Sequence, residues 1–324
     1  MVSAKPNMDL AKSFFPLLGF FVLYKETNMK VFVTGASGFV GTAVVQELLK
    51  AGHQVLGLAR SEASATKLQA AGAEVHYGDL EDLDSLRKGA AESDGVIHCG
   101  FIHDFTRFAE VCAIDERAIE TIAGVLAGSD RPLIVTSGTA LVSPGSLATE
   151  DMPSPFNPAW PRASERAAEA AAAAGANASI IRLPPSVHGE GDHHGFIPIL
   201  VNTAREKGFS AYIGEGRNRW NAGHRLDAAL LYRLALEQAT PGARFHANTE
   251  EGITLKSIAE AIGQQLNLPV RSISAEEGAA HFGWFAHMVA IDCPVSSRWT
   301  QEQLNWHPSH PFLLADIENG VYTR

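Results

Sequence analysis

The segment from Val31 to Gly41, with the sequence VFVTGASGFVG, constrains the fold more than any other part of the chain. An apolar run precedes three glycines, and apolar residues at helical spacing follow them. This order predicts a buried strand, a tight turn and a helix whose first amides face an anion. Gly35 suits the turn, Gly38 lets a pyrophosphate approach the backbone, and Gly41 lets the helix pack closely on the strand. The alternative is a glycine-rich turn without a ligand.

Composition predicts a globular protein with a sizeable core. The chain has 324 residues, of which 46% are hydrophobic and 19% charged, so we expect one nucleotide-binding domain with a second lobe. The net charge of -10, without a basic cluster, argues against nucleic acid or an anionic membrane surface as the partner. The cysteines Cys99, Cys112 and Cys293 are widely spaced and indicate a reducing, cytoplasmic location, with neither a disulfide framework nor a metal site.

The first 28 residues include an apolar run, Phe14 to Tyr24, that is too short to span a bilayer as a helix. No small-residue cleavage pattern follows it, and the first predicted strand begins just after Met29. We therefore expect residues 1–28 to be an extension outside the fold rather than a membrane anchor. A nucleotide-binding domain is predicted over 29–185, and a smaller substrate-binding lobe, partly interleaved with it, over 186–324.

The three-glycine pattern, with one extra residue between its first two glycines, resembles the short-chain dehydrogenase/reductase superfamily. The resemblance implies an α/β fold of the Rossmann type, in which a doubly wound parallel sheet has helices on both faces and a smaller C-terminal lobe follows. It further implies that a nicotinamide dinucleotide lies against the glycine turn. The residues that would hold its diphosphate are Gly35, Ser37, Gly38, Phe39, Val40 and Gly41.

The second predicted strand begins at Gln54, and its end should meet the adenosine ribose. An acidic residue there would accept hydrogen bonds from a free 2′-hydroxyl, whereas Arg60 with Ser61 suits a 2′-phosphate. The sequence therefore favours NADP, with NAD as the other possibility. The alternative for Arg60 is a solvated surface residue.

Two further segments are expected to contact the cofactor. Asp79 and Leu80 end a short strand, and Asp79 has two interpretations. It could cap the helix that begins near Leu83, or it could bind the adenine amino group, as the resemblance implies. Gly100 ends the next strand and would let the chain pass under the ribose and diphosphate.

Candidate catalytic residues follow two central strands. The resemblance places the serine that binds a substrate carbonyl or hydroxyl at Ser137, with Thr139 as the alternative. These hydroxyls could instead satisfy backbone groups at the strand end. His103 and Asp104 come just after the strand that Gly100 ends, where open α/β sheets place ligands, so both are candidates for proton transfer or substrate contact. Asp104 could equally cap the next helix.

The chain departs from the superfamily in lacking the Tyr-x-x-x-Lys pair, whose lysine lowers the tyrosine pKa for proton exchange. No lysine stands four residues after Tyr24, Tyr77, Tyr212, Tyr232 or Tyr322. Alignment on the helix that follows puts Pro161 at the tyrosine position and Glu165 at the lysine position. Arg162 and Arg166 are cations on this helix, but a guanidinium is a poor proton donor. This pattern resembles the atypical branch of the superfamily.

The second half is similar to the extended, epimerase-like branch in scattered segments. The segment from Arg182 to Gly191 resembles Arg-x-x-x-x-Tyr-Gly-x-Gly of that branch, in which the loop covers the nicotinamide. The resemblance implies that Pro184, Ser186 and Val187 contact the ring and its carboxamide, and that His188 takes the place of a tyrosine.

Two other features of this half concern acids and histidines. Asp227, in a segment similar to Val-His-Val-Asp-Asp of the branch, is expected to cap the helix over 228–238. His188, His193 and His194 lack a second ligand cluster at recognisable spacing, so we expect no metal site.

These features predict an NADP-dependent oxidoreductase or epimerase-like enzyme. Hydride would move between nicotinamide and a carbonyl or carbinol carbon of a small molecule held by Ser137, and His103, His188 or a water would supply the proton. The alternative is a catalytically silent protein of the same fold that senses NADP(H). We expect a monomer or a homodimer, with no nucleic-acid or membrane partner.

Overall fold

The structure, a computed structural model, describes residues 28–323 except 141, 156 and 158–159. The apolar run that begins at Phe14 lies outside the described residues, and so does the expectation for the N-terminal extension. In the part of the chain that the structure describes, each helix is too short or too polar to cross a membrane.

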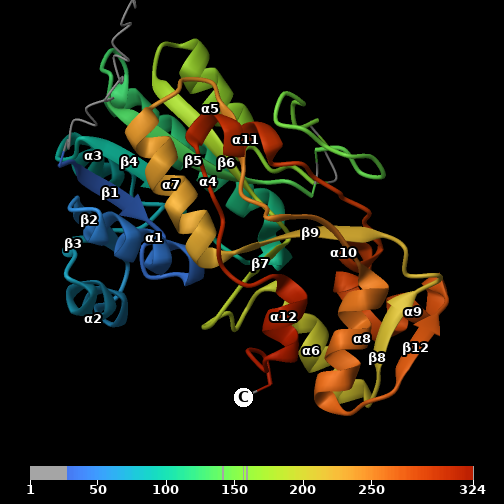
Figure 1. Ribbon diagram of the computed structural model, residues 1–324. Coiled ribbons are helices and arrows are strands. Elements are labelled where there is room, and N and C mark those ends of the chain that lie inside the picture. The colour runs from blue at the N-terminus through green and yellow to red at the C-terminus, as the bar shows by residue number, and fades with distance from the viewer. Residues whose placement is uncertain (1–27, 141, 156, 158–159, 324) are drawn as a thin grey trace, which may run out of the picture.

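A seven-stranded parallel sheet forms the centre of the molecule (Figure 1), with the strand order β10-β6-β5-β4-β1-β2-β3. The chain builds outward from β1 to β3 and then crosses to the other side of β1 to continue with β4. The carboxyl ends of β1 and β4 therefore mark the switch point at which such sheets bind ligands. The predicted doubly wound Rossmann-type fold is confirmed. The strands are β1 (Lys30–Thr34), β2 (Gln54–Ala59), β3 (Glu74–Tyr77), β4 (Gly95–His98), β5 (Pro132–Gly138), β6 (Asn177–Leu183) and β10 (Arg244–His246).

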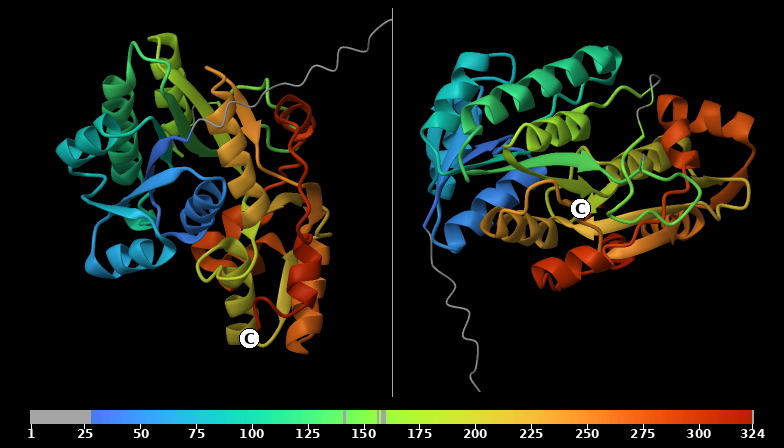
Figure 2. Two further views of the ribbon diagram at one scale, coloured as in Figure 1. Left: turned by 60° about the vertical axis from the view of Figure 1, so that its left-hand side comes forward. Right: turned by 90° about the horizontal axis from the view of Figure 1, so that it is seen from above.

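Helices cover both faces of this sheet (Figure 2). One layer contains α1 (Phe39–Lys50), α2 (Glu62–Ala71) and α7 (Arg225–Gln238), and the other contains α3 (Leu83–Ala91), α4 (Phe108–Leu126) and α5 (Ser164–Ala173). The central strands are apolar on both sides: Ile97 and Ile134 belong to the core under α1 and α7, and Val96 and Val135 to the core under α4 and α5. Burial on both faces is typical of parallel strands between helical layers.

A smaller body with its own core, around Trp220, Ile258 and Phe285, follows β6 (Figure 1). β7, β9 and β11 form a three-stranded sheet, and β8 pairs with β12. α7 and β10 come from the same half of the chain but lie with the main sheet, and the division at residue 185 stays a prediction. The elements are β7 (Ser186–His188), α6 (Phe196–Lys207), β8 (Ser210–Ile213), β9 (Arg219–His224), β11 (Glu250–Thr254), α8 (Leu255–Leu266), β12 (Val270–Ile273), α9 (Ala275–Phe282), η2 (Gly283–Phe285), α10 (Ala286–Ala290), α11 (Arg298–Leu304) and α12 (Leu313–Glu318).

The expected cap of α7 was wrong. This helix begins at Arg225 because the Nδ1 atom of His224 accepts the amide of Leu226 at 3.2 Å. Asp227, the expected cap, lies inside the first turn, and its carboxylate accepts the amides of Ser309 at 2.9 Å and His310 at 3.2 Å. Asp227 therefore binds a distant C-terminal segment instead of capping the N-terminus of its own helix.

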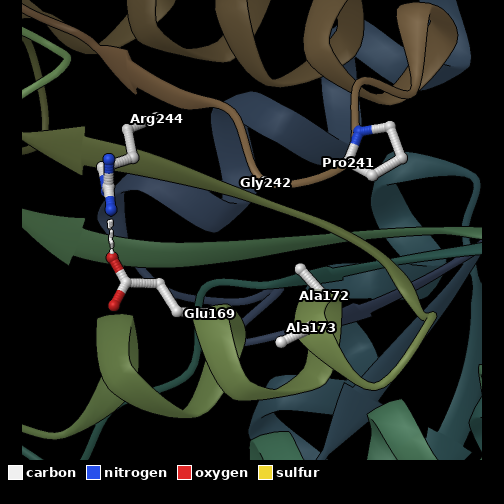
Figure 3. Close-up of a pocket in the computed structure, with 6 residues that line it drawn as sticks. All are labelled: Glu169, Ala172, Ala173, Pro241, Gly242 and Arg244. Carbon is white, nitrogen blue, oxygen red and sulfur yellow. Dashed lines mark hydrogen bonds and ion pairs between the residues drawn. The ribbon is translucent and has the colours of Figure 1, made fainter.

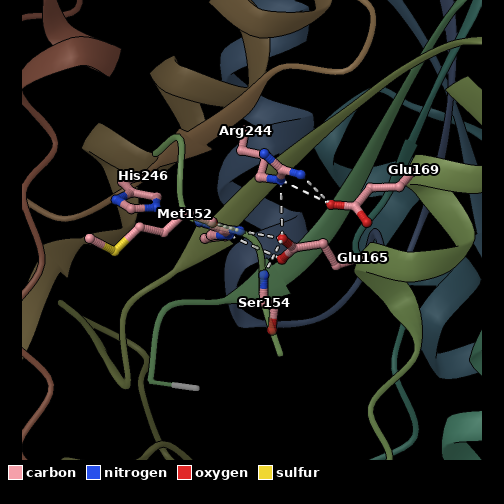
Figure 4. A network of polar contacts seen from close by, with 7 residues as sticks. Met152, Ser154, Glu165, Glu169, Arg244 and His246 are labelled. Atoms are coloured by element: carbon pink, nitrogen blue, oxygen red, sulfur yellow. Dashed lines mark hydrogen bonds and ion pairs between the residues drawn. The ribbon is translucent and has the colours of Figure 1, made fainter. Parts of the chain in front are cut away.

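A buried polar network joins β6, β10 and α5 (Figure 4). Arg182, which is fully buried on β6, donates from Nε to Glu165 at 3.0 Å and also contacts this carboxylate through Nη2. Its Nη1 donates to Nε2 of His246 at 3.0 Å, and its Nη2 donates to the carbonyl of Met152 at 2.7 Å. Arg244 brings a second cation to within 3.3 Å of Glu165. Removing one partner would leave a buried charge uncompensated, so the network fixes α5 against the last strands.

His246 makes the stability of this network depend on pH. Its Nε2 accepts from Arg182, and its Nδ1 lies 2.7 Å from the carbonyl oxygen of Ser296, so the ring is neutral with its proton on Nδ1. Burial, and then the charge of Arg182, lower the pKa of His246 from 6.5 to about 3. On acidification the unfolded chain protonates this histidine before the folded protein does. The stability that neutral His246 contributes is therefore complete above pH 6.5 and is lost as the pH falls toward 3.

We expect urea unfolding to show that His246 lowers the free energy of unfolding by about 2–4 kcal/mol as the pH falls from 6.5 toward 3. His246→Gln should remove much of this slope of unfolding free energy against pH, because an amide side chain does not titrate there. His287→Gln, at an exposed histidine, is the control and should leave the slope unchanged. An equal slope in His246→Gln and the parent would show that another group carries the acid sensitivity.

Candidate active site

The glycine turn brings β1, α1 and the end of β4 into very close contact. Gly35 has a φ of +65°, and a Cβ there would lie 2.7 Å from the amide nitrogen of Gly100. A Cβ on Gly41 would lie 2.1 Å from the carbonyl oxygen of Gly35. The amide of Gly38 donates to the same carbonyl at 2.9 Å and closes the turn. Gly35 is therefore required by its backbone conformation, and both Gly35 and Gly41 by the lack of space.

The N-terminus of α1 is suited to an anion. Gly38 is its N-cap, no side chain accepts a hydrogen bond there, and the first turn has no acidic residue. The first amides therefore keep unsatisfied hydrogens next to the positive end of the helix dipole. Arg225, at the start of α7, adds a charge with its guanidinium carbon 5.2 Å from the ring centre of Phe39. Ser37 and Val40 are half-buried beside these groups. The residues present thus fit a diphosphate.

The expected adenosine end lies after β2 and β3. Arg60 is exposed at the end of β2, and Ser61 caps α2 by accepting the amide of Ser64 at 3.3 Å. Ser61 is therefore already used by the fold, whereas the guanidinium of Arg60 faces solvent. The choice of NADP over NAD by these residues stays a prediction.

The capping alternative for Asp79 was wrong. Asp82 caps α3 by accepting the amide of Ser85 at 3.1 Å. Asp79 instead accepts the amide of Glu81 at 2.9 Å within the loop, and Leu80 beside it is half-buried. Contact of Asp79 with adenine stays a prediction.

Thr34 and Gly100 meet at the switch point between β1 and β4. The hydroxyl oxygen of Thr34 accepts the amide of Gly100 at 3.0 Å. A Cβ on Gly100 would lie 3.0 Å from this oxygen and 3.2 Å from the side chain of Leu80. Gly100 therefore has little room for a side chain even before a ligand is considered.

The hydroxyls at the end of β5 have different surroundings. Thr139 is 1% exposed and donates to the side-chain oxygen of Asn221 at 2.9 Å, so its hydroxyl is bound within the fold. Ser137 is 8% exposed, and no group in the described part of the chain makes a hydrogen bond with its hydroxyl. Because strand residues alternate, Ser137 points to the same side as Val135, toward α4 and α5. Ser137 is thus the hydroxyl that is available to a ligand.

The two residues that we expected at the tyrosine and lysine positions have structural surroundings. Pro161 is half-buried, and Glu165 is bound to Arg182 in the network described above. Tyr232 brings a phenol to the end of β5, where it lies 2.7 Å from the hydroxyl of Thr136. Burial raises the pKa of Tyr232 well above 10, and the side chain has no exposed surface, so it is unsuited to proton exchange.

Arg162 is the cation that the structure brings to this edge, just before α5. Its Nε donates to the hydroxyl of Ser164 at 3.0 Å, and its guanidinium carbon lies 4.1 Å from the ring centre of Phe101. Ser164 in turn donates to Asp115 on α4 at 2.5 Å. Arg166, one turn later, is exposed and paired with Glu116 on α4.

The loop after β4 contains His103 and Asp104. Asp104 accepts the amide of Thr106 at 3.1 Å and so caps η1 (Phe105–Arg107), the single turn that precedes α4. His103 is exposed as a residue, but its imidazole lies against Phe101. Desolvation there and the charge of Arg162 lower the pKa of His103, so we expect a neutral ring at pH 7.

His188, in the segment after β6, is enclosed by the fold and is not open to solvent. His188 is fully buried on β7, and its Nδ1 lies 2.7 Å from the carboxylate of Asp316. Its Nε2 and the hydroxyl of Ser186 are buried, without a hydrogen-bond partner in the described chain. Pro184 is buried and Val187 half-buried beside them. Their contacts with the nicotinamide stay predictions.

A cluster of possible metal ligands lies near this loop. His224, Asp227 and His310 have ligand atoms within 4.8 Å of one another. The two imidazoles are stacked, with 4.7 Å between their centres and 6° between their planes, so their in-plane lone pairs run parallel instead of converging. Asp227 and Nδ1 of His224 already accept backbone amides. We assign no metal to this cluster or to His193 and His194, whose rings lie 6.4 Å apart.

Two surface cavities lie on the edge strand β10, away from the glycine turn. One of about 480 Å³ is lined by Glu169 and Arg244 (Figure 3), and a neighbouring one of about 680 Å³ reaches Trp299. Strands β6 and β5 separate β10 from β4. Neither cavity is therefore the expected cofactor cradle.

Comparison with known proteins agrees with this geometry. Residues 31–247 match the sequence model of the NAD dependent epimerase/dehydratase family. An uncharacterised protein of Schizosaccharomyces pombe is 50% identical over 91% of this chain and 100% of its own length. The 2-alkyl-3-oxoalkanoate reductase of Stenotrophomonas maltophilia is 30% identical over 66% of this chain and 67% of its own.

Among solved structures, a dTDP-glucose 4,6-dehydratase from Streptomyces venezuelae with NAD bound has a TM-score of 0.71 at 18% identity, covering 90% of this chain and 96% of its own. The match shows a shared fold. The glycine turn, the switch point and the family match together define a nicotinamide-dependent protein of the short-chain dehydrogenase/reductase superfamily. Within it, the chain belongs to the NAD dependent epimerase/dehydratase family.

The turn offers a direct test. Gly41→Ala should destabilise the protein by about 2 kcal/mol or more and abolish binding of nicotinamide dinucleotides, because its Cβ would displace the Gly35 carbonyl. Gly124→Ala, at an exposed position of α4 with no atom within 4 Å of the added Cβ, should raise stability by about 0.5–1 kcal/mol and leave binding unchanged. Calorimetry of unfolding and of binding measures both. Normal dinucleotide affinity in Gly41→Ala would show that the turn does not hold the diphosphate.

Proposed function

We propose that the protein is an NADPH-dependent oxidoreductase that reduces a carbonyl group of a small molecule. The observation that carries the proposal is the hydroxyl of Ser137, which lies at the carboxyl end of β5 without a hydrogen-bond partner in the described chain. The open N-terminus of α1 lies at the same end of the sheet. Ser137 would donate to the substrate carbonyl oxygen and hold it for hydride addition. The direction of reduction is supported by the relative that is named as a reductase.

The bound nicotinamide would supply the hydride to the carbonyl carbon. The chain must then deliver a proton to the oxygen, and His103 is better placed than His188. His188 is fully buried and paired with Asp316, whereas His103 lies on the loop after β4, which ends beside β5. A neutral imidazole at pH 7 can pass a proton from water without storing a charge beside Arg162. We assign His103, or a water that it orients, to this transfer.

The second candidate function is a protein that binds NADP(H) without turnover. The absence of the Tyr-x-x-x-Lys pair favours it, and so does the use of Glu165 in a structural ion pair. Tyr232 does not replace the missing phenol, because it is buried and bonded to Thr136. Fluorescence titration with NADPH followed by a screen of aldehydes and ketones separates the two functions. A sensor would bind NADPH but would not oxidise it with any compound in the screen.

Ser137→Ala should lower kcat for the best screened carbonyl compound by roughly 10- to 1,000-fold, since it removes one donor to the developing oxyanion, while the Kd for NADPH stays unchanged. Thr139→Val is the matched control. It should cost about 1–3 kcal/mol of stability through the lost bond to Asn221, with a smaller effect on kcat. Equal activity of Ser137→Ala and the parent would remove the serine from the mechanism.

Arg60 tests the choice of cofactor. The exposed guanidinium at the end of β2 suits a 2′-phosphate, so Arg60→Glu should weaken NADPH by roughly tenfold or more and leave NADH nearly unchanged. Lys67→Glu reverses a charge on the exposed side of the neighbouring helix α2 and serves as the control for long-range electrostatics. Equal weakening of NADPH by both variants would mean that Arg60 does not contact the phosphate.

A further inference from the structure

A chain of buried hydrogen bonds runs from the switch point to Arg162. Nε of Arg162 donates to Ser164 at 3.0 Å, and Ser164 donates to Oδ2 of Asp115 at 2.5 Å. The other carboxylate oxygen of Asp115 lies 3.1 Å from Nε2 of His98. Nδ1 of His98 lies 2.9 Å from the hydroxyl of Thr34. Four elements, β1, β4, α4 and α5, therefore contribute to the placement of one guanidinium.

The hydrogens along this chain have a consistent direction. Thr34 already accepts the amide of Gly100, so its own hydrogen can go to Nδ1 of His98, and Nε2–H of His98 then donates to Asp115. Asp115 is 2% exposed. Its burial acts to raise its pKa, but the hydrogen bond from His98 and the charge of Arg162 lower the pKa overall. Asp115 is thus a buried carboxylate that holds the cation through Ser164.

The remaining surface of Arg162 is that of a binding group. Arg162 is half-buried, one face of its guanidinium lies on the ring of Phe101, and one edge is fixed by Ser164. In the described chain, no hydrogen bond uses its two terminal nitrogens. Phe108 and Trp160, with ring centres 4.4 Å apart, extend the aromatic surface next to Phe101. A planar cation thus stands beside an apolar wall, with its outer edge available.

We propose that Arg162 binds a carboxylate of the substrate, so that the protein reduces oxo acids whose apolar part lies against the aromatic wall. The inference rests on the proposed function, because it names the substrate class of the same site. Ser137 lies at the end of β5 on the face that α4 and α5 cover, and Arg162 precedes α5 with its guanidinium on Phe101, in the loop after the neighbouring strand β4. A substrate can therefore be held by its carbonyl at Ser137 and by its carboxylate at Arg162. A guanidinium grips a carboxylate with two parallel hydrogen bonds, which the corresponding ester cannot match.

Asp115 is a positioning residue in this arrangement. It touches no ligand, but without its charge Ser164 would lose the acceptor that orients it, and Arg162 could leave the ring of Phe101. Loss of the Asp115 charge should therefore reduce the preference for acids without changing the affinity for NADPH.

The test uses the full chain and three phenyl oxo acids, benzoylformate, benzoylacetate and benzoylpropionate, each against its methyl ester. With NADPH, we expect at least one acid to exceed its ester in kcat/KM by roughly tenfold or more. Arg162→Met should bring this ratio near one by lowering the value for the acid, and Arg162→Lys should restore part of it. Asp115→Asn should lower the ratio through a higher KM for the acid. Arg166→Met, at an exposed residue of α5 that is paired with Glu116 on α4, should leave the ratio unchanged.

Binding measurements keep this inference separate from the proposed function. If no compound is reduced, calorimetry of the acids with the protein saturated with NADP still decides: binding of an acid that Arg162→Met abolishes supports the carboxylate site, although the reductase proposal fails. Equal ratios in Arg162→Met and the parent, or no preference for any acid in either measurement, would overturn the inference. Loss of NADPH affinity in Arg162→Met, with an unchanged acid-to-ester ratio, would show that Arg162 serves the cofactor instead.

Discussion

The contact between the first residues of α1 and the carbonyl of Gly35 determines how the rest of the molecule can be arranged. Because Gly41 has no side chain, α1 can start directly after the turn that ends β1. The unsatisfied amides of its first turn then lie at the switch point. The neighbouring strands then place Thr34, Gly100 and Ser137 along the same edge. One steric requirement thus fixes the position of an anion site relative to every group that we assign to the chemistry.

Buried charge determines the other side of the site. Glu165 is the residue that we expected at the superfamily's lysine position, and the structure compensates for this acid with Arg182 from β6 and Arg244 from β10. The cation beside the aromatic loop comes instead from Arg162, with Asp115 as its buried counterpart. The sheet end therefore contains both signs of charge, in two groups held by different elements: Glu165 with two arginines, and Asp115 linked to Arg162 through Ser164. Such groups are costly to break one partner at a time, which keeps the edge of the sheet rigid.

Local sequence predicted the elements that depend on local patterns. β1, the turn and α1 follow from an apolar run and glycine spacing. The caps were predicted less well. Asp79 and Asp227 are acids near helix starts, but which residue accepts the first amides depends on where the backbone turns, and that moved the caps to Asp82 and His224.

Contacts between distant segments were beyond sequence reasoning. His98, Asp115 and Ser164 are separated by 17 and 49 residues, and nothing in their spacing shows that they meet. Arg225 beside Phe39 is a similar case, since the sequence shows only a cation at a helix start. The choice of Ser137 over Thr139 also needed the structure, because only the partner Asn221 shows that Thr139 is occupied.

The hydrogen bonds that Asp227 accepts have a consequence for the end of the chain. Ser309 and His310 bind this carboxylate, and a few residues later Asp316 meets the buried ring of His188. The tail is thus tied both to the helix that lies on α1 and to the loop expected over the nicotinamide. Cutting the chain before residue 309 would leave one acid and one imidazole buried without counterparts. The terminal segment is therefore part of the packed structure. A purification tag or fusion partner is better attached after this segment than in place of it.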